Sequence, residues 1–404
     1  MSFFLTTFAT QMKKDYLYIV FSILLSAFQL SANAQTITYS DSVEISLLTC
    51  SPGKEIWSHY GHTAIRYNDY QNGNDLAINY GLFSPSQPYF ILRFIFGLTD
   101  YRVGIEPMGA FLEQYKYEGR GVIEQKLKLT KEEKYKIFMA LKENLKPENL
   151  VYRYNYFYDN CTTRAERMLL DHINRKITTE SKGYCSENTY RECIHKWNSD
   201  YKWAQFGEDL LLGLEADEPF DTHSKANFLP DNLRKFFNYS KNNGKPLVKT
   251  TLQLLKADNY NTGTEGFPIS PIQVSIIFAI IAAIALILRW NTNGSLWWIW
   301  DLFQMIVSGI IGMILFAMIF SKHPCVNLNF IIFIFNPLCL VFLIPSIKKT
   351  KQGLKDWWWT FWGIFIILGL TGCFFQRIPF PVVIVALFLL LNCIMHHKGV
   401  KVLR

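Results

Sequence analysis

The sequence predicts an α+β domain outside the membrane, followed by an all-α membrane domain of five helices. Three observations lead to this fold class. The first 34 residues have the form of an export signal, residues 35–255 mix strand-like and helix-like patterns, and residues 272–404 are dominated by long apolar runs. Residues 256–271, rich in Asn, Thr, Gly and Pro, form the predicted linker between the two domains.

The N-terminus reads as a signal peptide over residues 1–34. Lys13 and Lys14 precede a short apolar run, and Ser-Ala-Asn-Ala follows it at 31–34. A charged start, a short apolar stretch and an Ala-x-Ala end are the features that signal peptidase requires. We therefore expect cleavage after Ala34, and an uncleaved anchor helix is the alternative.

Five later runs are long enough to cross a bilayer, which needs roughly 17–25 apolar residues in a helix. Tryptophans stand at several of their ends, as in the aromatic belts of membrane proteins. The predicted spans are 272–288, 299–320, 328–347, 357–375 and 379–395.

Most of the net positive charge of the chain lies in the loops between these spans and in the C-terminal tail. The formal net charge is +8. The loops 289–296 and 348–356 and the C-terminal tail hold eight Lys and Arg residues, whereas the other loops hold only Lys322 and Arg377. By the positive-inside rule, the N-terminal domain lies outside and the C-terminus inside. We expect these sides to be the periplasm and the cytoplasm, on either side of a bacterial inner membrane. The charge is thus explained by membrane topology, and it gives no support for nucleic-acid binding.

Three alternating segments predict strands at 43–49, 62–67 and 75–80, with a polar turn at 68–73 between the last two. A six-residue loop would pair Tyr67 with Asn74, and would thereby place His62 directly opposite Asn79. Opposed residues have Cβ atoms about 4.5–5.5 Å apart, so Asn79 could hold the imidazole of His62. This pairing is a hypothesis from turn length.

A thiol stands where a helix is predicted to begin. A capping box at Thr130–Glu133 starts a helix that runs to about 145, and a second helix follows Asn160. With Asp159 or Asn160 as its cap, Cys161 lies in the first turn, where free amides and the helix dipole favour a thiolate. With His62 as general base, Cys161 is the candidate nucleophile and Asn79 the residue that orients the base. Taken singly, His62 could be a structural hydrogen bonder, and Cys161 a packed or disulfide-bonded residue.

Several other residues leave alternatives open. His59 could be the base in place of His62, and His323, in an outside loop, could meet a lipid headgroup or simply lie at the interface. The run 89–96 could dip into lipid or form core. Cys185 and Cys193 could pair as a disulfide. Asp301, near the inner end of a span, is expected to reach water.

No cofactor is expected, and no second pair of ligands has the spacing of a zinc site, so no metal is expected either.

Short motifs in both halves resemble one family. Ser51-Pro-Gly, Tyr60-Gly-His-Thr-Ala-Ile-Arg66, Asn79-Tyr-Gly and Asp159-Asn-Cys-Thr-Thr-Arg164 resemble the exported domain of the Bacteroidetes Lnb-type lipoprotein N-acyltransferases. The membrane half is similar through Ser321-Lys-His-Pro324, Asn327-Leu-Asn329 and Asn336-Pro-Leu338. The motifs follow the family's order and cover most of the chain.

The resemblance implies a permuted papain-like (NlpC/P60-type) fold for the periplasmic domain. In that group the base opens a strand, a polar residue follows on the next strand, and the nucleophile heads a helix. His62, Asn79 and Cys161 match these positions, although family members often have His where this chain has Asn79.

The implied reaction is acyl transfer through a thioester on Cys161. The donor would be a membrane phospholipid, and the acceptor the α-amine of a lipoprotein's lipidated N-terminal cysteine. A membrane-bound cysteine peptidase or amidase acting on peptidoglycan, and a non-catalytic lipid-binding sensor, are the alternatives.

Overall fold

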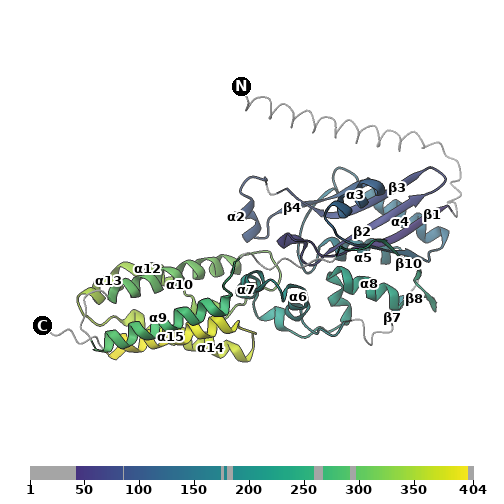
Figure 1. Ribbon diagram of the computed structural model, residues 1–404. Helices are drawn as coiled ribbons and strands as arrows, with labels where there is room; N and C mark the ends of the chain where they lie inside the picture. Colours follow the sequence, from purple (N-terminus) through teal and green to yellow (C-terminus); the bar gives the residue numbers. More distant parts are fainter. Residues whose placement is uncertain are drawn as a thin grey trace, which may run out of the picture. The chain divides into compact units, whose positions relative to one another are not determined.

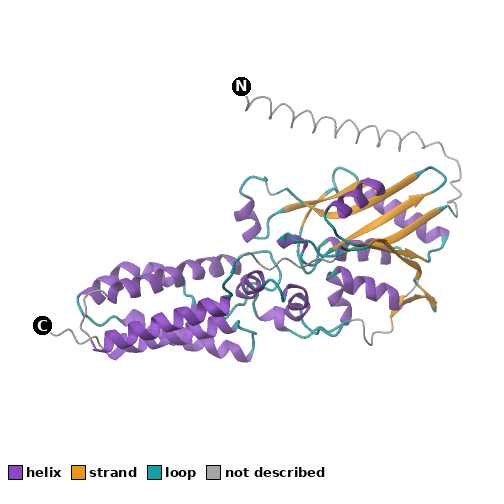
Figure 2. Cartoon of the chain, viewed as in Figure 1, coloured by secondary structure: helices purple, strands orange, loops and turns teal. Residues whose placement is uncertain are grey.

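The computed structural model describes residues 42–84, 86–173, 177–179, 185–258, 267–291 and 297–398. The predicted signal peptide, residues 1–34, lies outside the described residues, as do residues 259–266 of the predicted linker. The described part of the N-terminal half is a sheet with helices, and the C-terminal half is helical (Figures 1 and 2).

The N-terminal half is built on an antiparallel sheet of seven strands, in the order β10-β5-β1-β2-β3-β4-β6. These strands are β1 (Val43–Cys50), β2 (His62–Asp69), β3 (Asn74–Leu82), β4 (Asp100–Pro107), β5 (Val122–Leu127), β6 (Val151–Arg153) and β10 (Val248–Leu255). A smaller sheet joins β7 (Ile177–Thr179), β8 (Ser240–Asn242) and β9 (Lys245–Pro246).

Helices cover both faces of the large sheet. Thr63 bonds to Thr162 of α5, whereas its neighbour Ala64 packs in a core cluster with Met108 and Phe111 of α3. Because successive residues of a strand point to opposite faces, α5 and α3 lie on opposite sides of the sheet. The helices of this half are η1 (Ile56–Ser58), α2 (Phe90–Ile95), α3 (Met108–Tyr117), α4 (Lys131–Asn144), α5 (Cys161–Leu170), α6 (Tyr190–Asn198), α7 (Lys202–Leu211), η2 (Leu214–Asp217), η3 (His223–Phe228) and α8 (Pro230–Tyr239).

The three predicted strands and the two predicted helices are present, but the predicted register between β2 and β3 is wrong. Asn79 is paired with Ala64, two residues further along β2 than the expected His62. The turn is shorter than expected because Asp69 ends the strand: its Oδ1 accepts from the amides of Gln71 and Asn72. An offset of two residues keeps every side chain on its face, so Asn79 and His62 still point the same way.

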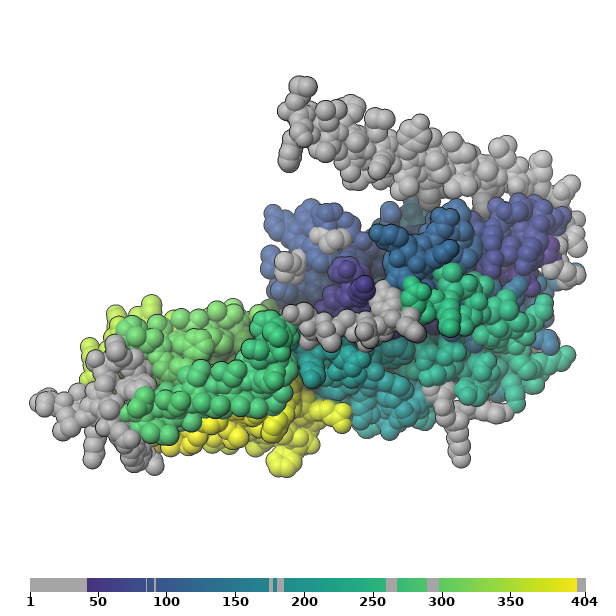
Figure 3. Space-filling view, viewed as in Figure 1, coloured from purple at the N-terminus to yellow at the C-terminus, as the bar shows by residue number. Residues whose placement is uncertain are grey.

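The C-terminal half contains, among the described residues, four helices long and apolar enough to cross a bilayer. They are α9 (Pro271–Asn291), α10 (Trp297–Ile319), α14 (Trp357–Thr371), which continues into η4 (Gly372–Phe374), and α15 (Phe380–Lys398). Exposed isoleucines of α9, such as Ile276, Ile280 and Ile284, fit a lipid-facing surface, and α9 and α10 form much of the face in Figure 3.

The third predicted span, 328–347, is not one straight helix. It consists of α11 (Ile331–Ile334), α12 (Leu338–Val341) and α13 (Leu343–Lys351), with a bend of 77° before α13. Pro337 and Pro345 interrupt the segment, because proline lacks the amide that a helix interior needs. The five predicted spans therefore correspond to four helices and one bent pair.

Asp301 does not reach water as expected. Its side chain is buried between α10 and α15, where Oδ1 accepts from Asn392 and Oδ2 lies 3.0 Å from His396 Nε2. His396 in turn stacks on Trp359 of α14, with ring centroids 4.0 Å apart. A polar side chain inside a helical bundle is stabilised by such partners, which hold the helices together.

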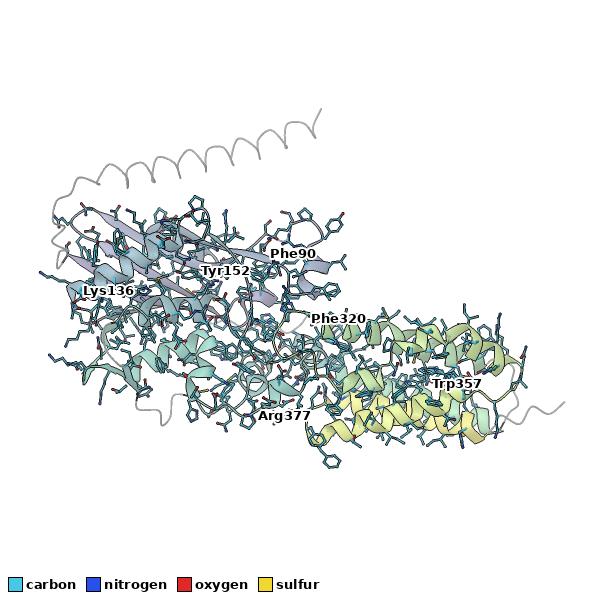
Figure 4. The ribbon with its side chains drawn as sticks, turned by 180° about the vertical axis from the view of Figure 1, so that it is seen from behind. Phe90, Lys136, Tyr152, Phe320, Trp357 and Arg377 are labelled. Carbon is cyan, nitrogen blue, oxygen red and sulfur yellow. The ribbon has the colours of Figure 1, made fainter. Side chains whose placement is uncertain are left out.

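The two ends of the helical half are distinct. Trp357 lies at the end far from the sheet, whereas Phe320 and Arg377 lie at the end that adjoins the N-terminal half (Figure 4). The loops after α10 and α14 thus lie on the side of the N-terminal half, as the predicted topology requires. The cytoplasmic C-terminus stays a prediction.

Candidate active site

Asn160 starts helix α5 and thereby places Cys161 in its first turn. Its Oδ1 accepts from the amides of Thr162 (2.8 Å) and Thr163 (2.9 Å), and its Nδ2 donates to the carbonyls of Tyr156 and Phe228. The hydroxyl of Thr163 accepts in return from the Asn160 amide, which completes a capping box. Of the two predicted caps, the structure uses Asn160, while Asp159 forms ion pairs with Arg164 and Arg167.

The sulfur of Cys161 is surrounded by groups that favour its ionised form. Burial raises the pKa of the thiol, but the charge of His62, a hydrogen bond from His62, the Thr63 amide and the Thr162 hydroxyl lower it more, so that the net pKa is about 7. Cys161 as a whole residue is partly exposed. A thiolate is the reactive form of cysteine, and here it is available near neutral pH.

The pKa of His62 is shifted in the opposite direction to that of Cys161. Burial lowers the pKa of His62, but the Cys161 thiolate, its hydrogen bond and the hydrogen bond to Asn79 raise it above its usual value. A lowered thiol pKa beside a raised imidazole pKa favours a thiolate–imidazolium pair. The imidazolium can return its proton to a leaving group, as nucleophilic catalysis by cysteine requires.

Two successive hydrogen bonds, from His62 to Asn79 and from Asn79 to Glu106, orient the imidazole ring of His62. His62 Nε2 lies 3.0 Å from Asn79 Oδ1, so Nε2 donates and Nδ1 is the nitrogen left for the thiol. Asn79 Nδ2 donates in turn to Glu106 Oε1 at 2.7 Å. Sequence reasoning missed Glu106, which lies on β4, 27 residues beyond Asn79; its only signal in the sequence is an acidic residue within a strand.

Two glycines allow the backbone to approach closely here. Gly61, with φ of 82°, precedes His62, and a Cβ at this position would lie 2.5 Å from the Cys50 carbonyl oxygen. Gly81, with φ of 86°, lies beside Cys161, and its Cβ would be 3.6 Å from that of Cys161. Because positive φ suits glycine, both positions explain why Tyr-Gly-His and Asn-Tyr-Gly occur as short motifs.

The other predicted histidines are placed elsewhere. His59 is buried, stacks on Tyr201 with ring centroids 3.6 Å apart, and directs Nε2 toward the Lys54 carbonyl. His323 is also buried, and its Nε2 donates to the Phe94 carbonyl. The geometry therefore favours His62 over His59 as the base, and it gives His323 a protein partner in place of a lipid headgroup.

The remaining thiols of this half differ from Cys161. Burial raises the pKa of Cys50 to about 12, so its thiol stays protonated at neutral pH. Cys185 and Cys193 are free thiols, hydrogen-bonded to each other in a buried cluster. Among the described residues, no group of three His, Cys, Asp or Glu side chains is arranged to hold a metal ion.

Comparison with known families adds two matches. Residues 31–196 match a family model described as the Lnb N-terminal periplasmic domain, and residues 262–401 match one described as the Lnb transmembrane domain. The two matches follow each other in the chain and cover most of it. No curated protein and no solved structure is detectably similar to the chain.

Proposed function

The chain belongs to the Lnb family and is a multi-pass membrane protein with a periplasmic N-terminal domain, and from this premise we propose that it is a cysteine-dependent lipoprotein N-acyltransferase. We further assign the periplasmic domain to the permuted papain-like (NlpC/P60-type) folds. The strand order supports this assignment: His62 opens β2, Asn79 lies on the adjacent β3, and Cys161 heads α5.

The observation that carries the proposal is the placement of Cys161 in the first turn of α5, beside a His62 that Asn79 holds, in a chain with helices long and apolar enough to cross a membrane. A thiolate attacks ester carbonyls, and a membrane supplies both glycerolipid esters and lipid-anchored acceptors. Placing the reactive thiol on a membrane-anchored domain raises its effective concentration toward substrates held in the same bilayer.

In the first step the Cys161 thiolate attacks an ester carbonyl of a membrane phospholipid. A carbon–sulfur bond forms, the carbon–oxygen bond breaks, and the His62 imidazolium gives its proton to the leaving alkoxide, which departs as a lysophospholipid. The Cys161 amide is our candidate donor to the oxyanion, because the Asn160 side chain already occupies the next two amides of α5.

In the second step the α-amine of a lipoprotein's lipidated N-terminal cysteine attacks the thioester. A carbon–nitrogen bond forms, the carbon–sulfur bond breaks, and His62 accepts the proton that the amine loses. The cycle thereby regenerates the thiolate–imidazolium pair. Asn79 holds the ring throughout, because its Oδ1 accepts from Nε2 in both protonation states of Nδ1.

Mass spectrometry of lipoprotein N-termini tests the proposal. The full-length chain and its Cys161→Ala variant are each expressed in a strain that lacks the native activity, and tryptic N-terminal peptides are compared. We expect an N-linked acyl chain only with the unaltered chain. Unchanged lipoproteins together with altered muropeptides would support a peptidoglycan amidase instead, and acylation by the Cys161→Ala variant would exclude a role for the thiol.

A further inference from the structure

Aromatic side chains form a continuous line that begins beside Cys161. Gly81 lies near both Cys161 and Tyr154, because a Cβ at this glycine would lie 3.6 Å from Cys161 Cβ and 3.6 Å from the Tyr154 ring. Tyr154 stacks on Tyr101, with ring centroids 4.2 Å apart, and Tyr101 contacts Phe83 at 5.0 Å. Each separation is within the range of ring contacts.

From Phe83 the line continues onto the surface. Phe83 contacts Trp57 and Phe90, each with ring centroids 5.9 Å apart, and Phe90 contacts Phe94 at 6.2 Å. We call the surface side chains of this region the aromatic strip: Trp57, Phe83, Tyr89, Phe90, Leu92 and Phe94. Exposure is 63% for Trp57, 79% for Tyr89, 57% for Leu92 and 45% for Phe94, so the strip offers apolar area to solvent.

The far end of the strip is fixed to the membrane domain. The Ser321 hydroxyl donates to the Ile95 carbonyl at 2.7 Å, and the Lys322 amide donates to the Phe96 carbonyl at 3.0 Å. Both residues follow directly after the membrane-spanning α10. Phe320, at the end of α10, is 64% exposed, and it lies on the same side of the molecule as Phe90 (Figure 4).

The end of the strip and the residues just after it pack closely against the loop that follows α10. Gly97 adopts φ of 63°, and a Cβ there would lie 2.8 Å from the His323 amide nitrogen. The His323 ring packs edge-on against Phe94 at 5.2 Å. The strip thus begins beside the residues that follow α10, and Tyr101 and Tyr154 connect its other end to the neighbourhood of Cys161.

We propose that the aromatic strip carries an acyl chain of a membrane glycerolipid from the outer bilayer surface to Cys161. Scattered exposed apolar residues are ordinary, but a contiguous row of them marks an interaction surface. Its continuity with a membrane-spanning helix identifies the occupant as lipid. An acyl chain that left the bilayer without such a surface would expose its methylenes to water, which is unfavourable for each methylene.

The role given to the strip rests on the proposed function, since the strip would bring a lipid ester to the thiol. Its physical content is independent of catalysis, because it states where an acyl chain lies. A binding measurement on a variant that cannot react therefore separates the two proposals.

Photo-cross-linking of the full-length Cys161→Ala chain provides that measurement. The chain is reconstituted in vesicles of phosphatidylethanolamine and phosphatidylglycerol that contain phosphatidylethanolamine with a diazirine near the end of one acyl chain. After irradiation, cross-linked peptides are mapped by mass spectrometry. We expect adducts within residues 83–94 in addition to adducts on the membrane helices.

Two matched variants in the same background sharpen the test. Replacing Tyr89 and Leu92 by Ser should lower the yield in residues 83–94 about tenfold, since two apolar contacts are lost. Leu252→Ser is the control: it removes a 39% exposed leucine from β10, at the opposite edge of the sheet, and should leave the yield unchanged. Equal adducts on the helices of both variants verify that they fold and insert.

The outcomes distinguish the two proposals. Adducts confined to the membrane helices, or an undiminished yield from the Tyr89 and Leu92 variant, would overturn the role of the strip, whatever the activity of the enzyme. Adducts on the strip of the Cys161→Ala chain, together with no N-acylation of lipoproteins by the unaltered chain, would retain the strip as a lipid-binding surface and refute the acyltransferase instead.

Discussion

The side chain of Asn79 is fixed between two partners of opposite character: Oδ1 lies 3.0 Å from His62 Nε2, and Nδ2 lies 2.7 Å from Glu106 Oε1. Because a carboxylate accepts hydrogen bonds only, Glu106 determines which end of the amide faces the imidazole. The amide oxygen then selects the tautomer of His62 that leaves Nδ1 for the thiol. Glu106 is therefore a positioning residue that acts on His62 through Asn79.

Removing the Glu106 carboxylate should slow catalysis without weakening substrate binding. In Glu106→Ala the Asn79 amide is free to turn its NH₂ group toward Nε2, so we expect kcat to fall about 10–100-fold, as is typical when a supporting partner is lost. KM should change little. Glu106→Gln retains an acceptor and should lose less. Steady-state acyl transfer gives kcat and KM separately, and a loss confined to KM would contradict this role.

The ionisation of Cys161 is measurable without a substrate. The pKa of about 7 predicts that the alkylation rate by iodoacetamide rises with pH to a plateau, with its midpoint near 7, because the thiol is protonated below that pH and ionised above it. In His62→Ala the midpoint should move up toward the ordinary value for a thiol. Cys50, with a pKa of about 12, should stay unreacted. A midpoint that does not respond to His62→Ala would exclude the ion pair.

The helix cap of α5 should contribute to both stability and reactivity. Asn160→Ala removes the acceptor for the Thr162 and Thr163 amides, which typically costs about 1 kcal/mol. We expect a lower Tm and a higher alkylation midpoint for Cys161. Thr189→Ala is the matched control, because Thr189 caps α6 through the Glu192 amide. It should lower Tm comparably and leave the alkylation midpoint unchanged, so equal midpoints in both variants would refute a role for the cap.

Glu166 should make the folded state less stable as pH rises. Burial raises the pKa of Glu166 to about 7, and the Asn227 amide and the Arg167 charge lower it only in part. Between the unfolded value of 4.5 and about 7, the unfolded chain ionises Glu166 while the folded chain does not. The folded state therefore loses stability across this window, by up to about 3 kcal/mol.

Glu166→Gln keeps the acceptor for Asn227 but cannot ionise. Its Tm should match that of the unaltered chain at pH 4.5 and exceed it at pH 8. Thermal unfolding of both proteins in the same detergent across this range provides the comparison. A constant difference in Tm at all pH values would show that Glu166 does not titrate between them.

Local sequence patterns predicted the parts of the site that depend on neighbours in the chain. Asn160 and Cys161 follow from helix-capping rules, and the face shared by His62 and Asn79 follows from strand alternation. The register was wrong by two residues, since turn length alone does not reveal that Asp69 binds the amides of the turn. An offset of two residues leaves each side chain on its predicted face, so Asn79 and His62 are still expected on the same face. An offset of one residue would have turned Asn79 to the other face.

Helix-capping rules and strand alternation do not predict contacts between segments that are distant in the sequence. Glu106 reaches Asn79 only because β4 pairs with β3, and Asp301 meets His396 only because α10 packs on α15. The bend in the third predicted span, 328–347, shows a related limit of hydropathy. Hydropathy counts apolar side chains, whereas Asn336-Pro337 and Pro345 act on backbone hydrogen bonds.

Three of the hydrogen bonds that join the periplasmic half to the membrane half link main-chain groups on both sides. The amides of Gly213 and Leu214 donate to the carbonyls of Cys325 and Leu328, and the Lys322 amide donates to that of Phe96. Such bonds are indifferent to the identity of most side chains but demand a fixed chain length on either side. The fit of the backbone is therefore constrained where the segments around residues 213 and 325 meet. A Cβ at position 213 would lie 2.1 Å from the Leu328 carbonyl oxygen, so a substitution of Gly213, like an insertion or deletion of one residue there, would push the two halves apart.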